Sequence, residues 1–178
     1  MRFTAAVTLC LVLAEVSPAA AQESPLQQLE FLAGHCWRGE FEDNEATDTH
    51  CYTWVFGRKH LRDVHVVSSE GSVYRGETIY SVDGDSGEIT FRYWNSLGGV
   101  SDGRLLFEGG VIRSPAEKYT GDDGETREFR SSLRQLDEFR YEAATEELVD
   151  GRWSNPARIT FTRTDKRTAA ADGNRGTQ

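Results

Sequence analysis

The sequence predicts an all-β protein: an antiparallel up-and-down barrel of about ten strands, with a short N-terminal helix. Between residues 36 and about 163, short runs rich in Val, Ile, Thr, Phe, Tyr and Trp alternate with clusters of turn-forming residues. No long helical pattern interrupts these runs, which argues against a parallel sheet with helical crossovers. Closure into a barrel would remove the two exposed edges that an open meander leaves.

Nine clusters of turn-forming residues separate the expected strands. They are Asp43-Asn44, Gly57-Arg58, Glu70-Gly71, Asp83-Gly84-Asp85-Ser86-Gly87, Gly98-Gly99, Gly109-Gly110, Gly121-Asp122-Asp123-Gly124, Gln135-Leu136-Asp137 and Asp150-Gly151. Ahead of the first strand, residues 26–32 form a short amphipathic pattern, with Ser24-Pro25 as a start signal and Gly34 as a stop signal. One small helix is therefore expected over Leu26–Leu32.

The N-terminus has the three parts of a secretory signal, which we expect to be cleaved after Ala21. These parts are the positive charge of Arg2, an apolar run over residues 3–14 and the small residues Ala19-Ala20-Ala21. The apolar run is shorter than the roughly 20 residues of a membrane-spanning helix, so we expect no stable membrane insertion; an uncleaved anchor is the alternative. The expected organisation is a signal peptide (1–21), one β-barrel domain (22–163) and a polar, disordered tail (164–178). Such a protein is periplasmic or secreted.

The chain is acidic, with 29 Asp and Glu residues against 20 Lys and Arg residues and a formal net charge of −9. Its few basic residues are scattered through acidic stretches and form no stripe. An acidic surface repels phosphate backbones and anionic headgroups, so the charge argues against nucleic-acid partners and binding to membrane surfaces. The sequence gives no indication of the oligomeric state.

Two cysteines, Cys36 and Cys51, remain after the signal, which contains Cys10. An even number of cysteines in an oxidising compartment predicts a disulfide bond. A metal pair or two free thiols are the alternatives, but there is no CxxC spacing and no third or fourth ligand at a usual interval.

A two-residue loop at Asp43-Asn44 would place Cys36 directly opposite Cys51, which suits a cross-strand disulfide. Side chains alternate between the two faces of a strand, so the same register gathers aromatic residues on one face. That face holds His35, Trp37, Phe41, His50, Tyr52, Trp54 and Phe56. We expect it to be the inner face, with the disulfide on the outer wall.

The next loop, at Gly57-Arg58, admits two registers. A two-residue loop places Asp63 opposite Tyr52 and His65 opposite His50, so that both point inward. A three-residue loop turns the other face inward, with His60, Arg62, Val64 and Val66. The residues of the loop favour the first register, because Gly is preferred at the first central position of a type II′ turn. The number of apolar residues that would point inward favours the second register. We favour the first.

His50, His65 and Asp63 are the candidate catalytic residues if the protein is an enzyme. A histidine with a carboxylate partner has a defined tautomer and can exchange protons near neutral pH. The same residues, together with Tyr52, could instead bind a metal ion, or they could form a structural cluster in which the polar groups hydrogen-bond only to one another. We expect no metal and no cofactor. There is no G-x-S-x-G motif and no Gly-rich phosphate loop, which argues against a serine hydrolase and against nucleotide use.

The candidate ligand-binding residues are mostly aromatic: Trp37, Tyr52, Trp54, Tyr93 and Arg92. Aromatic side chains on an inner face can line a pocket for a flat or apolar molecule. The alternative is that they are core residues. Of the neighbours Tyr93 and Trp94, at least one must face outward on a regular strand.

The segment Phe31-Leu32-Ala33-Gly34-His35-Cys36-Trp37-Arg38-Gly39 resembles the LxGxWxG opening of small exported bacterial barrels in the lipocalin-like (calycin) superfamily. The run from Tyr80 to Ile89 is similar to a hairpin of the same families. The resemblance implies a closed meander with a cavity, but no activity. Arg92 and Arg140 each neighbour a Tyr, similar to the carboxylate grip of fatty-acid carriers in that superfamily. Nitrobindin-type relatives bind haem through a C-terminal histidine; no histidine follows His65 here, so the departure argues against haem.

These observations favour an exported lipocalin-like module that binds a small apolar or amphipathic molecule. One alternative is a cofactor-free isomerase, lyase or hydrolase that uses the His/Asp group in the barrel. Another is an envelope protein that contacts a protein partner through its outer wall.

Overall fold

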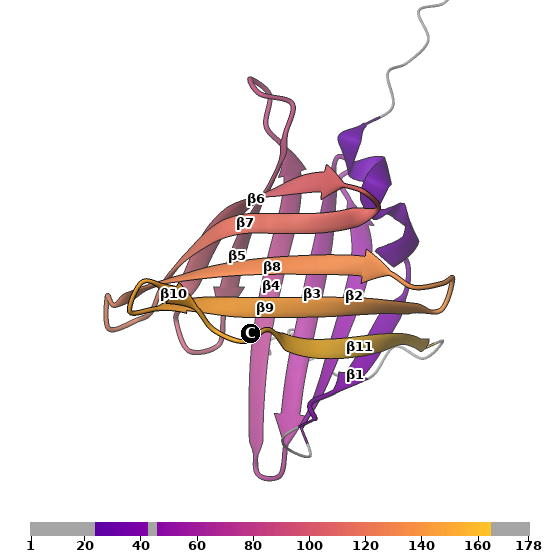
Figure 1. The fold of residues 1–178 in the computed structure, drawn as a ribbon. Coiled ribbons are helices and arrows are strands. Elements are labelled where there is room, and N and C mark those ends of the chain that lie inside the picture. The colour runs from indigo at the N-terminus through magenta and orange to yellow at the C-terminus, as the bar shows by residue number, and fades with distance from the viewer. Residues whose placement is uncertain (1–23, 43–45, 165–178) are drawn as a thin grey trace, which may run out of the picture.

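The computed structural model describes residues 24–42 and 46–164, which form a closed antiparallel barrel of ten strands (Figure 1). A short helix precedes the barrel, and a two-residue strand, β10, lies outside the ring as part of a small hairpin. The elements are η1 (Pro25–Leu32), β1 (Cys36–Glu40), β2 (Thr47–Val55), β3 (His60–Ser69), β4 (Ser72–Val82), β5 (Ile89–Asn95), β6 (Val100–Glu108), β7 (Val111–Thr120), β8 (Thr126–Gln135), β9 (Arg140–Val149), β10 (Arg152–Trp153) and β11 (Ala157–Thr164). The predicted fold class is confirmed.

Strands β1 to β9 follow one another around the barrel, and β11 completes the ring between β9 and β1. The closing seam is short: β1 pairs with β11 from Cys36 opposite Thr164 to Arg38 opposite Thr162. Eight of the nine predicted turn clusters lie between described strands. The ninth, Asp43-Asn44, falls at residues outside the described part of the chain.

The N-terminal segment forms a 3-10 helix rather than an α-helix. Three residues per turn place Leu26, Leu29 and Leu32 on one face, and all three are buried. The Oγ of Ser24 caps the first turn by accepting a hydrogen bond from the backbone N–H of Leu26 (3.4 Å). The predicted helix is confirmed, and its leucine spacing explains the 3-10 geometry.

The leucines of η1 pack onto an aromatic group inside the barrel. Trp37 is fully buried, and its Nε1–H donates to the backbone carbonyl of Leu32 (3.1 Å). The Trp37 ring meets Tyr141 edge-on, and Tyr141 stacks on Phe161 with ring centroids 4.8 Å apart. We call Leu26, Leu29, Leu32, Trp37, Tyr141 and Phe161 the apolar cluster.

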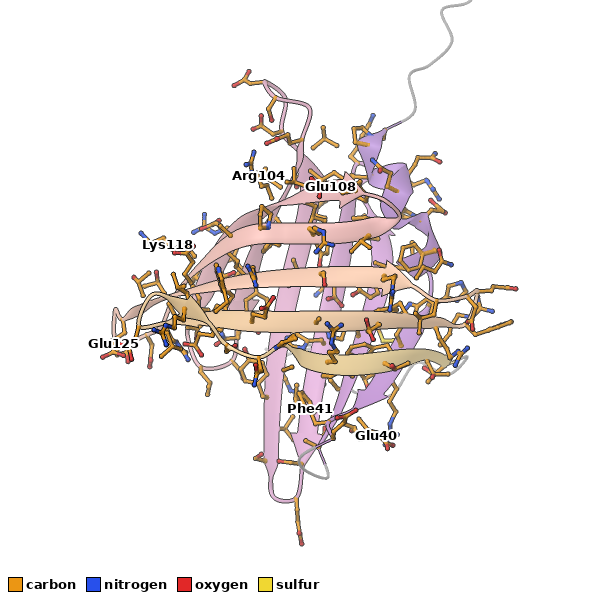
Figure 2. The ribbon with its side chains drawn as sticks, viewed as in Figure 1. Glu40, Phe41, Arg104, Glu108, Lys118 and Glu125 are labelled. Atoms are coloured by element: carbon orange, nitrogen blue, oxygen red, sulfur yellow. A yellow bond between two sulfur atoms is a disulfide. The ribbon has the colours of Figure 1, made fainter. Side chains whose placement is uncertain are left out.

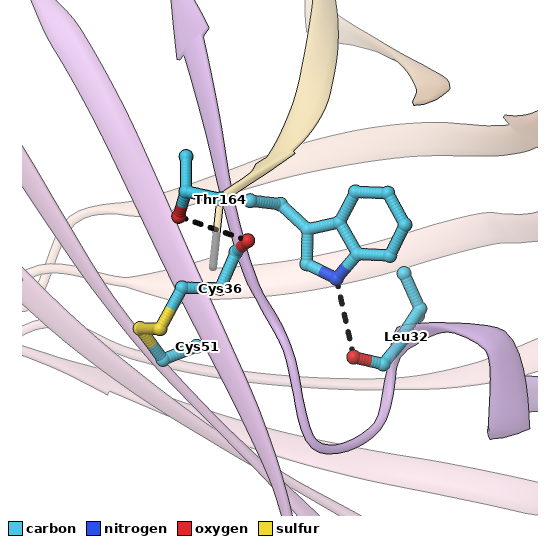
Figure 3. The surroundings of a disulfide bond; sticks show 5 residues. Leu32, Cys36, Cys51 and Thr164 are labelled. Atoms are coloured by element: carbon cyan, nitrogen blue, oxygen red, sulfur yellow. Dashed lines mark hydrogen bonds between the residues drawn. A yellow bond between two sulfur atoms is a disulfide. The ribbon is translucent and has the colours of Figure 1, made fainter. Parts of the chain in front are cut away.

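The disulfide bond joins Cys36 of β1 to Cys51 of β2, and the two residues face each other in the strand register (Figure 3). The predicted disulfide is confirmed. Beside it, the Oγ1 of Thr164 donates to the backbone carbonyl of Cys36 (3.1 Å), which ties β11 to the same point. The bond closes a sequence separation of 15 residues and should stabilise the fold by about 3 kcal/mol. It is compatible with an oxidising compartment outside the cytoplasm.

The register between β2 and β3 is the first of the two predicted. His50 faces His65, Tyr52 faces Asp63 and Trp54 faces Leu61. Asp63 is therefore buried inside the barrel, and the register with a three-residue loop is wrong.

The inner-face prediction fails at Phe56, which is 81% exposed because it sits in the turn with a positive φ of 50°. The domain prediction also needs one change, because Thr164 belongs to β11 and not to the tail. The predicted signal peptide (1–21) and the rest of the predicted tail lie outside the described residues.

Charged side chains cover the outer wall, and Figure 2 shows Arg104, Glu108 and Lys118 projecting away from the barrel. Within residues 24–42 and 46–164, no helix has the length and hydropathy needed to cross a membrane.

Candidate functional site

The barrel encloses a cavity of about 560 Å³. Most of its wall is aromatic or aliphatic, and the polar side chains are concentrated on a few strands. The aromatic residues that line it are Phe41, Tyr52, Tyr74, Tyr80, Phe91, Tyr93, Tyr119, Phe129, Tyr141 and Phe161. Leu29 and Leu32 also line it, so the apolar cluster forms part of the cavity wall. A cavity of this size suits a small organic molecule.

A group of polar side chains on the cavity wall comes from β2 and β3. Alternation along β2 places Asp48, His50 and Tyr52 on the inner face, and alternation along β3 does the same for Asp63 and His65. Because His50 and His65 face each other across the two strands, their rings stack, with centroids 4.7 Å apart. These adjacent, hydrogen-bonded strands hold five titratable side chains in one place.

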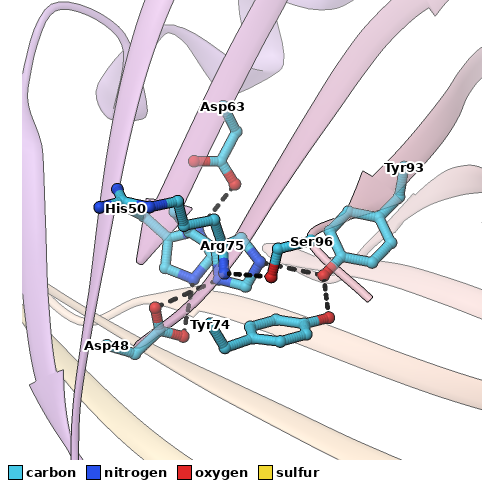
Figure 4. A network of polar contacts seen from close by, with 8 residues as sticks. Asp48, His50, Asp63, Tyr74, Arg75, Tyr93 and Ser96 are labelled. Carbon is cyan, nitrogen blue, oxygen red and sulfur yellow. Dashed lines mark hydrogen bonds and ion pairs between the residues drawn. The ribbon is translucent and has the colours of Figure 1, made fainter. Parts of the chain in front are cut away.

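A continuous chain of hydrogen bonds joins these side chains (Figure 4). The Nδ1 of His50 lies 2.7 Å from the Oδ2 of Asp63, and its Nε2 lies 3.1 Å from the Oδ2 of Asp48. The other oxygen of Asp48 lies 3.2 Å from the Nδ1 of His65. The Nε2 of His65 then contacts the hydroxyl of Tyr93 (3.1 Å), which is hydrogen-bonded to the hydroxyl of Tyr74. We call Asp48, His50, Asp63, His65, Tyr74 and Tyr93 the polar cluster.

His50 is held as an imidazolium in this arrangement. Burial by itself lowers the pKa of His50, but the charges of Asp63 and Asp48 and the hydrogen bonds to them raise it from 6.5 to about 10. Both ring nitrogens can then donate to a carboxylate. Burial likewise raises the pKa of Asp48, yet His50 and the hydrogen bonds from both histidines hold it far below its usual 3.8.

His65 has a different environment, with one carboxylate and one phenol as partners. When the Nδ1–H of His65 donates to Asp48, the Nε2 of His65 can accept a hydrogen bond from the Tyr93 hydroxyl. Gly76 of β4 faces His65, and a Cβ at this position would lie 2.1 Å from the Nε2 of His65 and 2.5 Å from the Tyr93 ring. Only glycine leaves room for this pair.

Two buried polar atoms on the cavity wall have no hydrogen-bond partner among the described residues. They are the Oδ1 of Asp63 and the Oγ of Ser114. Leaving such atoms unpaired costs about 1–3 kcal/mol each. Both residues line the cavity, but the two atoms themselves are covered by protein, so a ligand could bond to them only after a movement of the side chains.

Glu117 of β7 is a further carboxyl on the cavity wall. It accepts a hydrogen bond from the hydroxyl of Ser101, a fully buried residue of β6. Burial raises the pKa of Glu117, although the hydrogen bond from Ser101 opposes this.

Five of the predicted site residues line the cavity: His50, His65, Asp63, Tyr52 and Tyr93. Trp37 and Trp54 do not line it. Trp37 is buried in the apolar cluster, and Trp54 packs against the core beneath the guanidinium of Arg58 (4.7 Å). The core alternative therefore describes both tryptophans better.

Arg92 lies outside the cavity, so its prediction as a pocket residue is wrong in geometry. Its side chain is 57% exposed, and its Nε lies 3.6 Å from a carboxylate oxygen of Asp102. Neighbouring side chains on a strand point to opposite faces. Because the ring of Tyr93 points inward, the side chain of Arg92 points outward. Arg140 is also exposed and pairs with Asp137, so neither arginine can grip a carboxylate inside the barrel.

Sequence reasoning missed Asp48, Tyr74 and Glu117. A signal existed for Asp48, because it stands two residues before His50 on the same strand and so must share its face. Tyr74 could have been found only from the register between β3 and β4, where it faces Val67.

Comparisons with known proteins assign this chain to no family. A scan against models of protein families finds no match, and a search of curated proteins finds no similar sequence. The closed ten-strand barrel is consistent with a lipocalin-like fold. Assignment to the calycin or nitrobindin families has no support from these comparisons.

Proposed function

We propose that this protein binds a small, largely apolar organic molecule inside the barrel, as an exported lipocalin-like carrier or sensor. The cavity of about 560 Å³, with its aromatic lining and few polar groups, carries the proposal. Pockets for small molecules are concave and mostly apolar, with a small number of polar groups that fix the orientation of the ligand. Export and membership in the lipocalin-like families are part of the same proposal.

The charges around the cavity favour a neutral or positively charged ligand over a fatty-acid anion. Three carboxyl groups line the cavity, from Asp48, Asp63 and Glu117. The positive charges near the cavity are the imidazolium of His50 and the guanidinium of Arg127, and Arg127 is an exposed residue. Because like charges repel, an anionic ligand would be disfavoured beside the carboxyl groups of Asp63 and Glu117.

With a small movement of Asp63 and Ser114, hydrogen-bond donors on the ligand would satisfy the two unpaired oxygen atoms of these residues. The Oδ1 of Asp63 accepts only, and the hydroxyl of Ser114 can donate or accept. An amphipathic molecule with an amine, amide or hydroxyl group on an apolar body fits both features. Aromatic rings around these acceptors add favourable contacts with a cationic group.

Native mass spectrometry of the exported, disulfide-bonded protein tests the proposal. We expect an additional mass that is lost on denaturation, at one molecule per chain. The released compound should be uncharged or cationic and mainly apolar. If the protein carries nothing, and no apolar amine, amide or alcohol in a thermal-shift panel raises its melting temperature, the proposal is wrong.

A matched pair of variants ties binding to the cavity. Ala143→Phe places a ring on the cavity wall, whereas Ala116→Phe adds the same ring at an exposed position of β7. We expect Ala143→Phe to abolish the bound mass and Ala116→Phe to retain it. Equal binding by both variants would place the ligand outside the barrel.

Acid–base catalysis is the second candidate, favoured by the paired histidines and carboxylates in the cavity. His50 is protonated over the neutral range, so it can act only as a weak acid or as a fixed positive charge. His65, with Asp48 on one nitrogen and the Tyr93 hydroxyl on the other, is the group suited to exchange a proton. Loss of turnover in a folded His65→Gln variant would support this candidate, and unchanged turnover would exclude it.

A further inference from the structure

Three metal-ligating side chains converge on one point of the cavity wall. Asp48 and His50 of β2 and His65 of β3 each direct one ligand atom toward the others, and these atoms all lie within 4.8 Å of one another. We propose that Asp48, His50 and His65 bind a divalent transition-metal ion of the zinc type. This site goes beyond the binding of an organic ligand and does not depend on it.

The spacing of the ligand atoms fits a shared ion. The Nε2 of His50 lies 3.1 Å from the Oδ2 of Asp48, and the Nδ1 of His65 lies 3.2 Å from the Oδ1 of Asp48. Metal–nitrogen and metal–oxygen bonds of about 2.0–2.2 Å at tetrahedral angles separate neighbouring ligand atoms by about 3.3–3.6 Å. The two distances end on different oxygens of Asp48, so this carboxylate would bind a shared ion through both oxygens or rotate to offer one of them.

Each histidine is also held through its other ring nitrogen, on the side away from Asp48. The Nδ1 of His50 is 2.7 Å from the carboxylate of Asp63, and the Nε2 of His65 is 3.1 Å from the hydroxyl of Tyr93. Metal-binding histidines almost always donate their second N–H to such a partner, which sets the tautomer and the direction of the ring. A metal ion would displace the proton from the Nε2 of His50 and would require the His65 tautomer with its proton on Nε2. His50 would then donate to Asp63, and His65 would donate to Tyr93.

The site is built on a rigid part of the barrel and faces its interior. The three ligands come from two paired strands, with His50 directly opposite His65. Their side chains are only 9–18% exposed. All three residues line the cavity, so a fourth ligand on the metal would come from the cavity side.

The donor set selects among metals. Two imidazoles and one carboxylate suit zinc, cobalt, nickel, copper and iron, whereas calcium and magnesium prefer oxygen ligands. Three protein ligands leave an open position, the arrangement of zinc sites that bind water or a substrate rather than purely structural sites. A ligand with a lone pair could therefore coordinate the ion from within the cavity.

Metal titration of the full, disulfide-bonded protein after treatment with a chelator tests the site. Calorimetry with zinc alone should show one ion per chain, and cobalt alone should give visible absorption bands of a four- or five-coordinate centre. X-ray absorption at the zinc edge should report imidazole ligands at about 2.0–2.1 Å. This spectrum uses the unmodified protein, so it decides the question even if the variants fold poorly.

Matched variants locate the ion. Asp48→Asn and His65→Gln should each abolish stoichiometric binding of zinc. His60→Gln is the control, because His60 lies outside the group and bonds to Ser81 instead. Asp63→Asn should keep one ion per chain but weaken the affinity about 10- to 100-fold, since it removes only the outer partner of His50.

The proposal is overturned if the unmodified protein binds neither zinc nor cobalt, which would leave the group as a hydrogen-bonded network only. It is also overturned if Asp48→Asn and His65→Gln bind zinc as tightly as His60→Gln does. A bound organic molecule without metal would support the proposed function alone. One zinc ion in a protein that binds no organic molecule would support the metal site alone.

Discussion

The apolar cluster and the two carboxylates of the polar cluster lie in the same barrel and are buried to a similar degree, yet their energetic effects are opposite. Trp37 and Tyr141 are 0% and 1% exposed, and Asp63 and Asp48 are 2% and 6% exposed. Burial of a large apolar side chain stabilises the fold by about 1.5–3 kcal/mol. Burial of a charge costs several kcal/mol, which a partner offsets only in part.

The contrast separates residues that hold the barrel together from residues that are retained at a cost. His50, with two carboxylate partners, satisfies charges that an apolar wall would not have introduced. Replacement of a buried ion pair by apolar residues is often neutral or stabilising. The polar cluster is therefore the better indicator of function, and the apolar cluster is the better indicator of fold.

The largest effect is expected from Trp37→Ala in the apolar cluster. The change leaves a large cavity and removes the hydrogen bond to the Leu32 carbonyl, so we expect a loss of about 3–5 kcal/mol in the free energy of unfolding. Denaturation by urea with the disulfide intact measures it. Trp94→Ala is the control, because Trp94 is 41% exposed, and it should cost less than about 1 kcal/mol. Equal losses would contradict the contrast.

His50→Leu should be destabilising for the opposite reason, because it leaves Asp48 and Asp63 buried without their cation. We expect a loss of about 3 kcal/mol, the low end of the usual range, since the side chain of His50 is 18% exposed. The triple variant Asp48→Leu/His50→Leu/Asp63→Leu should recover most of the loss. Urea denaturation compares the three proteins. A triple variant less stable than His50→Leu would show that the polar cluster stabilises the fold.

Gly76→Ala tests the close packing beside His65. The added methyl group would overlap His65 and Tyr93, and we expect it to separate their hydrogen bond and cost about 2 kcal/mol. Gly84→Ala is a matched control, because a Cβ at Gly84 meets no atom within 4 Å. Thermal unfolding measures both variants, and similar melting temperatures would contradict the expected overlap.

Glu117→Gln should give the smallest effect, and one that depends on pH. Burial raises the pKa of Glu117 in the folded state above its unfolded value of 4.5. The folded protein therefore binds this proton more tightly, and the resulting stability is present below pH 4.5 and lost as the pH rises through the raised pKa. The stability of the unmodified protein relative to Glu117→Gln should fall as the pH rises from below 4.5 through the raised pKa of Glu117. Urea midpoints at each pH measure the difference, and a rise would contradict this account.

Much of the fold could be predicted from local patterns. The turn clusters, the short helix and the Cys36–Cys51 pair follow from residue types that act within a few positions. The inward position of His50, Asp63 and His65 followed from two adjacent hairpins, because side-chain alternation carries through a tight turn. The two-residue loop length and the register predicted at Gly57-Arg58 were right, but the predicted type II′ turn was wrong, because Arg58 as well as Gly57 has a positive φ.

The side of β7 that carries Glu117 illustrates where alternation fails. Ser114 and Glu117 both line the cavity although they are three positions apart. A register shift between Ser114 and Glu117 in the pairing of β7 with β8 reverses the side-chain alternation there. Pro115 at this point cannot donate a ladder hydrogen bond, and it was the one local sign of the irregularity.

The sequence by itself determined the fold class, the disulfide and the identity of the inner face on the first hairpins, because each depends on residues that are close along the chain. Tertiary structure decided that a cavity remains, that β11 closes the ring, and that Tyr74 and Tyr93 of β4 and β5 complete the network begun on β2. Those outcomes depend on the stagger and closure of many strands together. No local pattern specifies that geometry.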